Sequence, residues 1–284
     1  MKIIQPKVEL WQQGEDKVAH VTRCARICYK KETGNDNALY GSLERRNHLS
    51  MYRHETYYSA VPAKGKDNLI YMALNGYLYN PYIKYFTYKD YCYIITNGNF
   101  LRNVQKINPV LFDLIYRYQI TPEEAEQIEL IWEHFMRYTF CVVTQISTSR
   151  ELNRVSPNNI AEQSTRYVYE DGTICCPWWL NEESIKQYEE EPIVDMISTV
   201  YLDSCSDSFK RYKFLIESGM DRQDARGVLP IDTATKCAYT YSIDEWRAII
   251  DLRYYGTTGV PHPNAKIVAG MIREQLMDLG YVFK

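Results

Sequence analysis

Apolar residues recur every three or four positions over several long stretches, which is the spacing of one buried helix face. In residues 16–30, Val18, Val21 and Ala25 share such a face, and Asp16 stands where a capping residue is expected. Thr121, followed by a proline and two acids, is a strong helix start. The sequence therefore predicts helices over residues 16–30, 37–53, 181–219, 243–255 and 263–279, with others between 99 and 135.

Shorter apolar runs predict strands. Residues 57–95 hold many tyrosines in a strand-like pattern. The Asn-Gly pairs at 75–76 and, just after this segment, at 97–98 indicate turns. Residues 136–146 and 233–242 are two further strand candidates. No repeat, linker or low-complexity tract divides the chain. The sequence thus predicts an α+β fold: one domain over residues 1–284, with a mixed or antiparallel sheet flanked by helices and a tyrosine-rich insertion.

One polar stretch fits neither pattern. Residues 150–167 read RELNRVSPNNIAEQSTRY and hold little apolar filler, although apolar segments lead into and out of them. Neither the helical nor the alternating pattern covers most of this stretch. A polar loop between two apolar elements is where binding groups tend to lie.

Composition narrows the function classes. The net charge of −3 gives no general attraction to nucleic acid or to an anionic membrane. No run of 18 apolar residues and no signal-peptide core occur, so we expect a cytoplasmic protein. The eight cysteines form no CxxC pair, and only five histidines are present, so reduced and mostly buried thiols are expected rather than a metal site or disulfides.

Three arginines stand in settings that suit an anion. Arg166 follows Gln163 and Ser164, Arg226 precedes an apolar run, and Arg253 ends an amphipathic helix. A guanidinium is a planar fork of donors that fits a phosphate or the edge of a base. An arginine in any one of these settings is more often a surface residue or paired with a carboxylate. Taken together with Gln163 and Ser164, the three arginines also fit an anion or nucleotide pocket. There is no triad context for a nucleophile, no glycine-rich phosphate loop, and no metal-ligand spacing among the histidines.

Several motifs of this chain, Arg166, Arg226 and Arg253 among them, resemble those of one protein family. The flavin-dependent thymidylate synthases have the signature Arg-His-Arg, two residues, Ser, four residues, Ser, one residue, Arg. Here Arg154 falls on its first arginine, and Ser164 and Arg166 fall on its final Ser and Arg. Further matches follow in the family's order: residues 20–29, His48-Leu49-Ser50, the Ala-Arg-x-x-Leu-Pro segment at 225–230, Leu252-Arg253 and His262. The chain resembles this family over most of its length.

The resemblance implies an enzyme, an FAD-dependent thymidylate synthase, that methylates dUMP to dTMP. Methylenetetrahydrofolate would supply the carbon and NADPH the reducing equivalents, in a homotetramer with shared active sites and no attacking cysteine. Arg253 would be catalytic, holding the uracil edge and favouring its ionised form. Contacts to dUMP would come from Glu151, Arg154, Glu162, Gln163, Ser164, Thr165, Arg166, Arg226 and Arg253. Contacts to FAD would come from His48, Ser50, Arg154, Val155, Ser156, Glu162, Ser242, Asp244 and His262.

The chain departs from the family's pattern at several positions. Val155 replaces the signature histidine, Ser156 the second arginine, and Asn159 the first serine. The segment at about 57–135 is an enlarged insertion relative to compact members of the family. Two alternatives therefore stay open: a related flavoenzyme that hydroxymethylates dUMP or methylates UMP, and a non-catalytic nucleotide-binding homologue.

Overall fold

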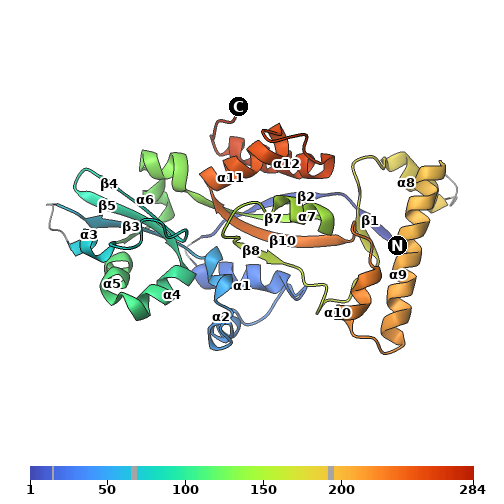
Figure 1. The fold of residues 1–284 in the computed structure, drawn as a ribbon, viewed down its shortest axis with the longest axis horizontal. Coiled ribbons are helices and arrows are strands. Elements are labelled where there is room, and N and C mark those ends of the chain that lie inside the picture. The colour runs from blue at the N-terminus through green and yellow to red at the C-terminus, as the bar shows by residue number, and fades with distance from the viewer. Residues whose placement is uncertain (15, 65–68, 191–194) are drawn as a thin grey trace.

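The computed structural model describes residues 1–14, 16–64, 69–190 and 195–284. The molecule is elongated, with a central sheet, a second sheet at one end and a pair of helices at the other (Figure 1). Within the described ranges, no helix combines the length and apolar character needed to cross a membrane. The helices and the antiparallel sheets confirm the predicted α+β class.

The central sheet is antiparallel, with the strand order β2-β7-β10-β8. Its strands are β2 (Lys7–Trp11), β7 (Arg137–Gln145), β8 (Ile160–Glu162) and β10 (Ala234–Ser242). Along β7 and β10 successive side chains point to opposite faces, as the pleat requires. Phe140 and Tyr239 pack in one core cluster, whereas their neighbours Cys141 and Ala238 pack in another. Both faces of the sheet are therefore buried, and the two central strands alternate apolar residues with buried threonines.

Helices cover the two faces (Figure 1). On one side lie α11 (Ile243–Ile250), the π-helical turn η4 (Asp251–Tyr255) and α12 (Pro263–Asp278). Trp246 of α11 and Ile272 of α12 are buried against this face. On the other side lies α1 (Lys17–Ile27), capped by Asp16, whose carboxylate accepts the Ala19 N–H at 2.9 Å. This cap confirms the predicted start of α1.

The predicted helix over residues 37–53 is wrong in its second half. Helix α2 (Asp36–Arg45) ends early, and Asn47 adopts a left-handed conformation with φ of 57°. A 3-10 turn, η1 (Leu49–His54), then begins. Asparagine tolerates this conformation better than most residues, so the polar sequence here ends the α-helix.

The tyrosine-rich region forms a sheet of its own, in the order β4-β5-β3-β6. Its strands are β3 (Thr56–Pro62), β4 (Ile83–Tyr88), β5 (Tyr91–Asn97) and β6 (Gln119–Ile120). Around them lie α3 (Leu69–Ala73), α4 (Gly98–Ile107), α5 (Pro109–Arg117), α6 (Pro122–Glu126) and the π-helical turn η2 (Ile131–Phe135). Buried Ile94, Phe100 and Leu111 belong to a cluster separate from the central core.

The turn predicted at Asn97-Gly98 is instead a junction between β5 and α4. Asn97 is the N-cap of α4, and its side-chain oxygen accepts the Phe100 N–H at 3.0 Å. The other pair, Asn75-Gly76, does lie in a turn, where Gly76 has φ of +89°. Asparagine before glycine thus served as a cap in one place and a turn in the other.

A buried ionic network joins this sheet to α2. The Glu55 side chain is only 2% exposed, and its carboxylate pairs with Arg102 of α4 at 3.1 Å. It also accepts hydrogen bonds from Tyr57 Oη at 2.7 Å and Tyr40 Oη at 3.0 Å. Close by, the Arg137 guanidinium donates to the Arg53 carbonyl at 2.8 Å. The chain therefore leaves for the second sheet and returns from it at neighbouring points.

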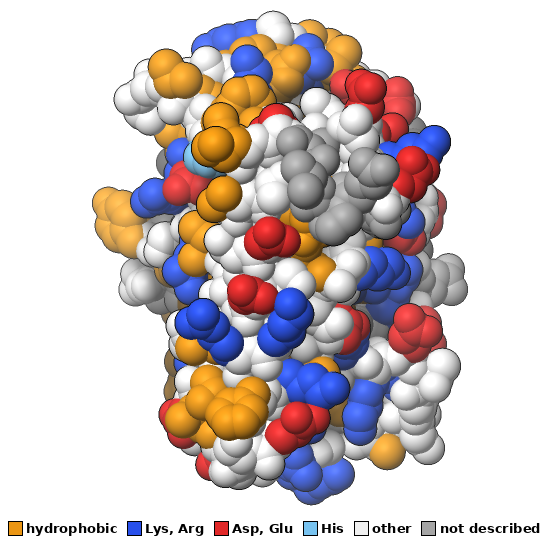
Figure 2. Space-filling view, turned by 90° about the vertical axis from the view of Figure 1, so that its right-hand side faces the viewer, with side chains coloured by type: hydrophobic (Ala, Val, Ile, Leu, Met, Phe, Trp, Pro, Cys, Tyr) orange, Lys and Arg blue, Asp and Glu red, His pale blue; other side chains and the backbone are white. Residues whose placement is uncertain are grey.

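At the opposite end lie α8 (Glu182–Glu190) and α9 (Met196–Glu217), beside the parallel pair β1 (Lys2–Ile4) and β9 (Thr173–Cys175). These two helices confirm the prediction for residues 181–219, whereas its restart at Pro192 lies outside the described residues. Figure 2 shows hydrophobic side chains on this end, interspersed with charged ones. Large apolar residues of α9 are exposed, among them Met196, Ile197, Val200 and Phe214. Patches of this kind often mark interaction surfaces.

A chain of buried hydrogen bonds crosses the central sheet and links two histidines. His20 Nε2 lies 3.0 Å from Thr139 Oγ1, which lies 2.7 Å from Thr240 Oγ1, and that hydroxyl lies 2.7 Å from His54 Nδ1. Burial lowers the pKa of His20 from 6.5 to about 4 and the pKa of His54 to about 3. Both imidazoles are therefore neutral in the folded protein at neutral pH.

Acidification should destabilise the protein through these two histidines. The unfolded chain takes up protons below pH 6.5, whereas the folded chain does not until about pH 4, so the stability present above pH 6.5 is lost as pH falls. We expect the free energy of unfolding to be about 2–3 kcal/mol lower at pH 5.5 than at pH 7.5, measured by urea titration. His20→Gln should remove about half of this difference. An undiminished difference in His20→Gln would contradict this account.

Candidate nucleotide site

A surface cavity of about 580 Å³ lies where the polar stretch meets the segment before β10. One wall comes from Glu162 to Thr165, which continue from β8. The opposite wall comes from Arg226 and the residues up to Ile231, on and after the 3-10 turn η3 (Arg226–Val228). Helix α7 (Ile146–Leu152) contributes Arg150. The structure thus brings together five of the residues predicted to hold a nucleotide: Glu162, Gln163, Ser164, Thr165 and Arg226.

Glu162 is held in place by hydroxyl groups. As the last residue of β8 it pairs with Cys237 of β10. Its carboxylate accepts a hydrogen bond from Ser149 Oγ at 2.8 Å and a longer one from Thr235 Oγ1 at 3.3 Å. These hydroxyl groups fix the position of the carboxylate, whose remaining lone pairs can accept a hydrogen bond from a sugar hydroxyl or a ring N–H.

Two arginines supply positive charge to the cavity. Arg226 follows α10 (Arg222–Ala225), donates to the Gln223 carbonyl at 3.0 Å, and donates to Thr165 Oγ1 at 3.0 Å. Arg150 approaches from the exposed end of α7. Among the described residues, neither guanidinium has a carboxylate oxygen within 4.0 Å. Two unpaired guanidinium groups in one cavity suit a phosphate.

Arg150 was missed at the sequence level. It precedes Glu151 and stands one helical turn before Arg154, which the family signature singled out. Arg154 is exposed and does not line the cavity, whereas Arg150 does. No sequence signal separated the two arginines, because the choice depends on where α7 ends.

Arg253 lies outside the cavity of its own chain. It sits on η4, and its guanidinium pairs with the Glu151 carboxylate at 3.0 Å and donates to the Glu151 carbonyl at 2.6 Å. Only 15% of the Arg253 side chain is exposed. Arg166 is exposed and points to Gln223, at 3.4 Å. The predicted contacts of Glu151, Arg154, Arg166 and Arg253 to the nucleotide remain predictions.

The predicted flavin residues lie on several elements of the chain. Ser242 and His262 cap α11 and α12, and Asp244 contacts His134 and Arg247. His48 and Ser50 are exposed on and beside η1, and they do not line the nucleotide cavity. Val155 packs against the central core, and Ser156 carries no charge. These contacts to FAD remain predictions.

The cysteines are not poised for nucleophilic attack. All eight are free, seven are buried, and Cys28, near Glu162, is half-buried. Burial raises the pKa of each thiol, to about 11 for Cys92 and Cys141 and to about 12 for Cys175. They are protonated at neutral pH and hence poor nucleophiles. In the part of the chain that the structure describes, no three side chains form a metal-ligating cluster.

Comparison with known proteins agrees with the sequence motifs. The family model of the thymidylate synthase complementing proteins matches residues 126–278, more than half of the chain. The flavin-dependent thymidylate synthase of Thermosipho melanesiensis is 24% identical over 165 residues, which cover 56% of this chain and 68% of that protein.

Two solved structures overlap loosely with nearly the whole chain. Both are of the UMP/dUMP methylase PolB from Streptomyces cacaoi, 16% identical to this chain and bound with 5-Br dUMP or with 5-Br UMP. Their TM-scores are 0.45 and 0.42, and they cover 98% of this chain and 93% or 92% of theirs. The family is shown by the sequence model that matches more than half of the chain. This chain is a divergent member of the thymidylate synthase complementing protein family.

Proposed function

We propose that this protein methylates a pyrimidine nucleotide, converting dUMP to dTMP in the manner of the flavin-dependent thymidylate synthases. The observation that carries the proposal is the cavity in which Arg150 and Arg226 face Glu162 to Thr165. It combines two unpaired cations with a fixed carboxylate and hydroxyl groups, which are the donors and acceptors that a nucleoside monophosphate needs. The family membership supplies the type of reaction.

Each side chain has a distinct role in this proposal. Arg150 and Arg226 bind the phosphate, and the Glu162 carboxylate accepts a hydrogen bond from the nucleoside. Arg253 stabilises the negative charge that develops on the uracil edge, where one fixed donor contributes about 3 kcal/mol. Because Arg253 does not line its own chain's cavity, it would act in the cavity of a neighbouring subunit. That arrangement requires the homotetramer that the resemblance implies.

The cofactors follow from the family and complete the proposal. FAD, reduced by NADPH, would supply the hydride, and methylenetetrahydrofolate would supply the carbon. With all eight thiols protonated, the chain's own residues bind, orient and stabilise the nucleotide rather than attack it. The flavin residues would be contributed by several chains.

A direct assay tests this function. The purified full chain should show flavin absorbance and should form dTMP from dUMP and methylenetetrahydrofolate only when NADPH is present. Mass spectrometry of the products from dUMP and from UMP identifies both the substrate and the transferred group. A colourless protein that forms no methylated nucleotide would overturn the proposal.

A second candidate keeps the cavity but changes the product. Val155 packs against the core and Ser156 is neutral where the family signature has a histidine and an arginine. This difference favours hydroxymethylation of dUMP or methylation of UMP, which the same mass spectra distinguish. A non-catalytic homologue would instead raise its melting temperature with dUMP by mass action and yield no product.

A further inference from the structure

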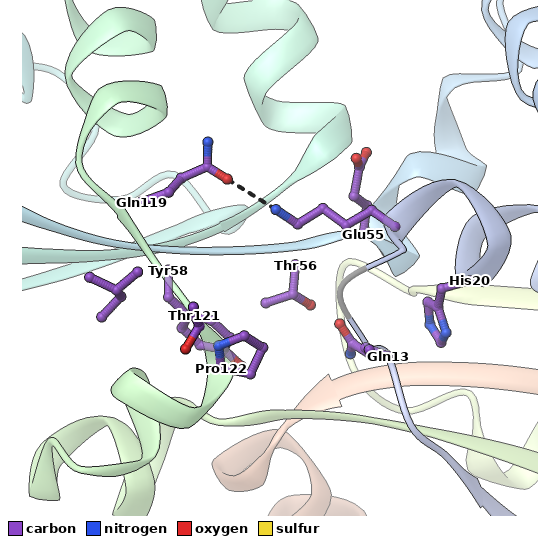
Figure 3. Close-up of a pocket in the computed structure, with 11 residues that line it drawn as sticks. Gln13, His20, Glu55, Thr56, Tyr58, Gln119, Thr121 and Pro122 are labelled. Carbon is purple, nitrogen blue, oxygen red and sulfur yellow. Dashed lines mark hydrogen bonds between the residues drawn. The ribbon is translucent and has the colours of Figure 1, made fainter.

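A second cavity lies between the tyrosine-rich sheet and the central part of the molecule. Its volume is about 240 Å³, and Figure 3 shows residues from both sides facing it. On one side, Gln13 follows β2 and His20 lies on α1. On the other side, Thr56 and Tyr58 lie on β3 and Gln119 lies on β6. It shares no lining residue with the nucleotide cavity.

The cavity holds a lysine that forms no salt bridge with any residue in the described ranges. Lys17 Nζ donates to Gln119 Oε1 at 3.0 Å, the dashed line in Figure 3, and lies 4.0 Å from the centre of the Tyr57 ring. Within residues 1–14, 16–64, 69–190 and 195–284, no carboxylate oxygen approaches Nζ to within 4.0 Å. Burial lowers the pKa of Lys17. A half-buried charge that lacks a partner is costly, and an anion in the cavity would offset that cost.

Glu55 also lines the cavity but does not neutralise Lys17. Its carboxylate is already bound by Arg102 at 3.1 Å and by the hydroxyl groups of Tyr40 and Tyr57. The Arg102 guanidinium balances the Glu55 charge locally, although Glu55 still favours the charged form of Lys17. Among the described lining residues, Lys17 is the one cation, and the donors that already bind the Glu55 carboxylate come from outside the cavity.

The remaining walls suit a small organic molecule. His20 is 5% exposed and uses Nε2 to contact Thr139, which leaves Nδ1 without a hydrogen bond among the described residues. Ile120, Pro122 and the ring of Tyr58 form an apolar wall. The cavity has room for about eight water molecules of about 30 Å³ each. A molecule of roughly the size of benzoate fits this volume.

We propose that this junction cavity binds a small organic carboxylate with an apolar body, whose carboxylate pairs with the Lys17 ammonium. The apolar body would lie against Ile120 and Pro122, and His20 Nδ1 would supply a directional hydrogen bond. The site is independent of the nucleotide cavity and of the proposed methylation. A bound carboxylate would bridge α1 and the tyrosine-rich sheet.

Ligand-observed NMR of the full chain with benzoate tests the proposal, with benzamide as the neutral ligand of the same shape. We expect benzoate to bind at least about tenfold more tightly than benzamide. Lys17→Met keeps the aliphatic stem and should weaken benzoate binding about tenfold or more, whereas Lys17→Arg keeps the charge and should stay within about threefold. Lys213→Met removes an exposed lysine on α9 and should have no effect.

Four results would overturn the proposal, three of them independent of the nucleotide cavity. The first is no benzoate binding by the wild-type chain, and the second is equal binding of benzamide. The third is undiminished benzoate binding by Lys17→Met, once its thermal melt shows that it is folded. Arg226→Ala distinguishes the two cavities: retained benzoate binding supports the junction site, and lost binding assigns benzoate to the nucleotide cavity and overturns the proposal.

Discussion

Arg226→Ala should weaken dUMP binding about ten- to hundredfold while leaving the fold intact. The Arg226 guanidinium is exposed and has no carboxylate partner within the described chain, so a phosphate would be its strongest ligand. Loss of a charge-assisted hydrogen bond costs about 1.5–3 kcal/mol. Isothermal titration calorimetry with dUMP measures the change. Deoxyuridine, which lacks the phosphate, should bind wild type and Arg226→Ala with similar affinity.

Arg45→Ala is the matched control for Arg226→Ala. Arg45 is an exposed arginine at the end of α2 and does not line the nucleotide cavity, so its loss should not change the affinity for dUMP. Both variants should unfold within about 0.5 kcal/mol of wild type, as surface substitutions do. Equal affinity of Arg226→Ala and wild type for dUMP would exclude Arg226 from phosphate binding.

Glu55→Gln should be the most destabilising single exchange of similar size in the buried ionic network that joins the tyrosine-rich sheet to α2. It leaves the Arg102 guanidinium, only 18% exposed, without its opposite charge. Removing one partner of a buried ion pair costs about 3–5 kcal/mol, because the other charge stays buried. The Gln side chain keeps part of the hydrogen bonding, so we expect about 3 kcal/mol, measured as a shift in the urea unfolding midpoint.

Two comparisons separate this cost from an ordinary charge effect. Glu9→Gln breaks an exposed pair with Arg23 and should cost less than about 1 kcal/mol. A double variant, Glu55→Leu with Arg102→Leu, removes both charges together and should recover much of the lost stability. If Glu55→Gln unfolds at the wild-type urea concentration, the pair contributes little and the network is held by its tyrosines.

Elements whose signal is local were predictable from the sequence. The cap of Asp16, the Thr121 capping box before α6 and the strand over residues 233–242 all depend on neighbouring residues, and the structure has each of them. Strands β1, β2, β8 and β9 were not predicted. They have three to five residues each, and they exist only because partners far along the chain pair with them.

In the candidate site, too, some residues were predictable from local motifs and others depend on how distant elements pack. Glu162 to Thr165 and Arg226 could be singled out because motifs carry them, and the structure brings them into one cavity. The place of Arg150 depends on where α7 ends, and the pairing of Arg253 with Glu151 depends on how η4 packs. Neither is encoded by residue spacing. The junction cavity was also missed, because its walls come from α1, β3 and β6, which no motif connects.

The contact between Arg137 and the Arg53 carbonyl, at 2.8 Å, has an evolutionary consequence. Because the chain departs and returns at neighbouring points, the intervening segment of about 80 residues can lengthen, shorten or diverge without moving the central strands. Selection can therefore act on the tyrosine-rich sheet separately from the nucleotide cavity. The lining residues of that cavity all lie outside the tyrosine-rich sheet.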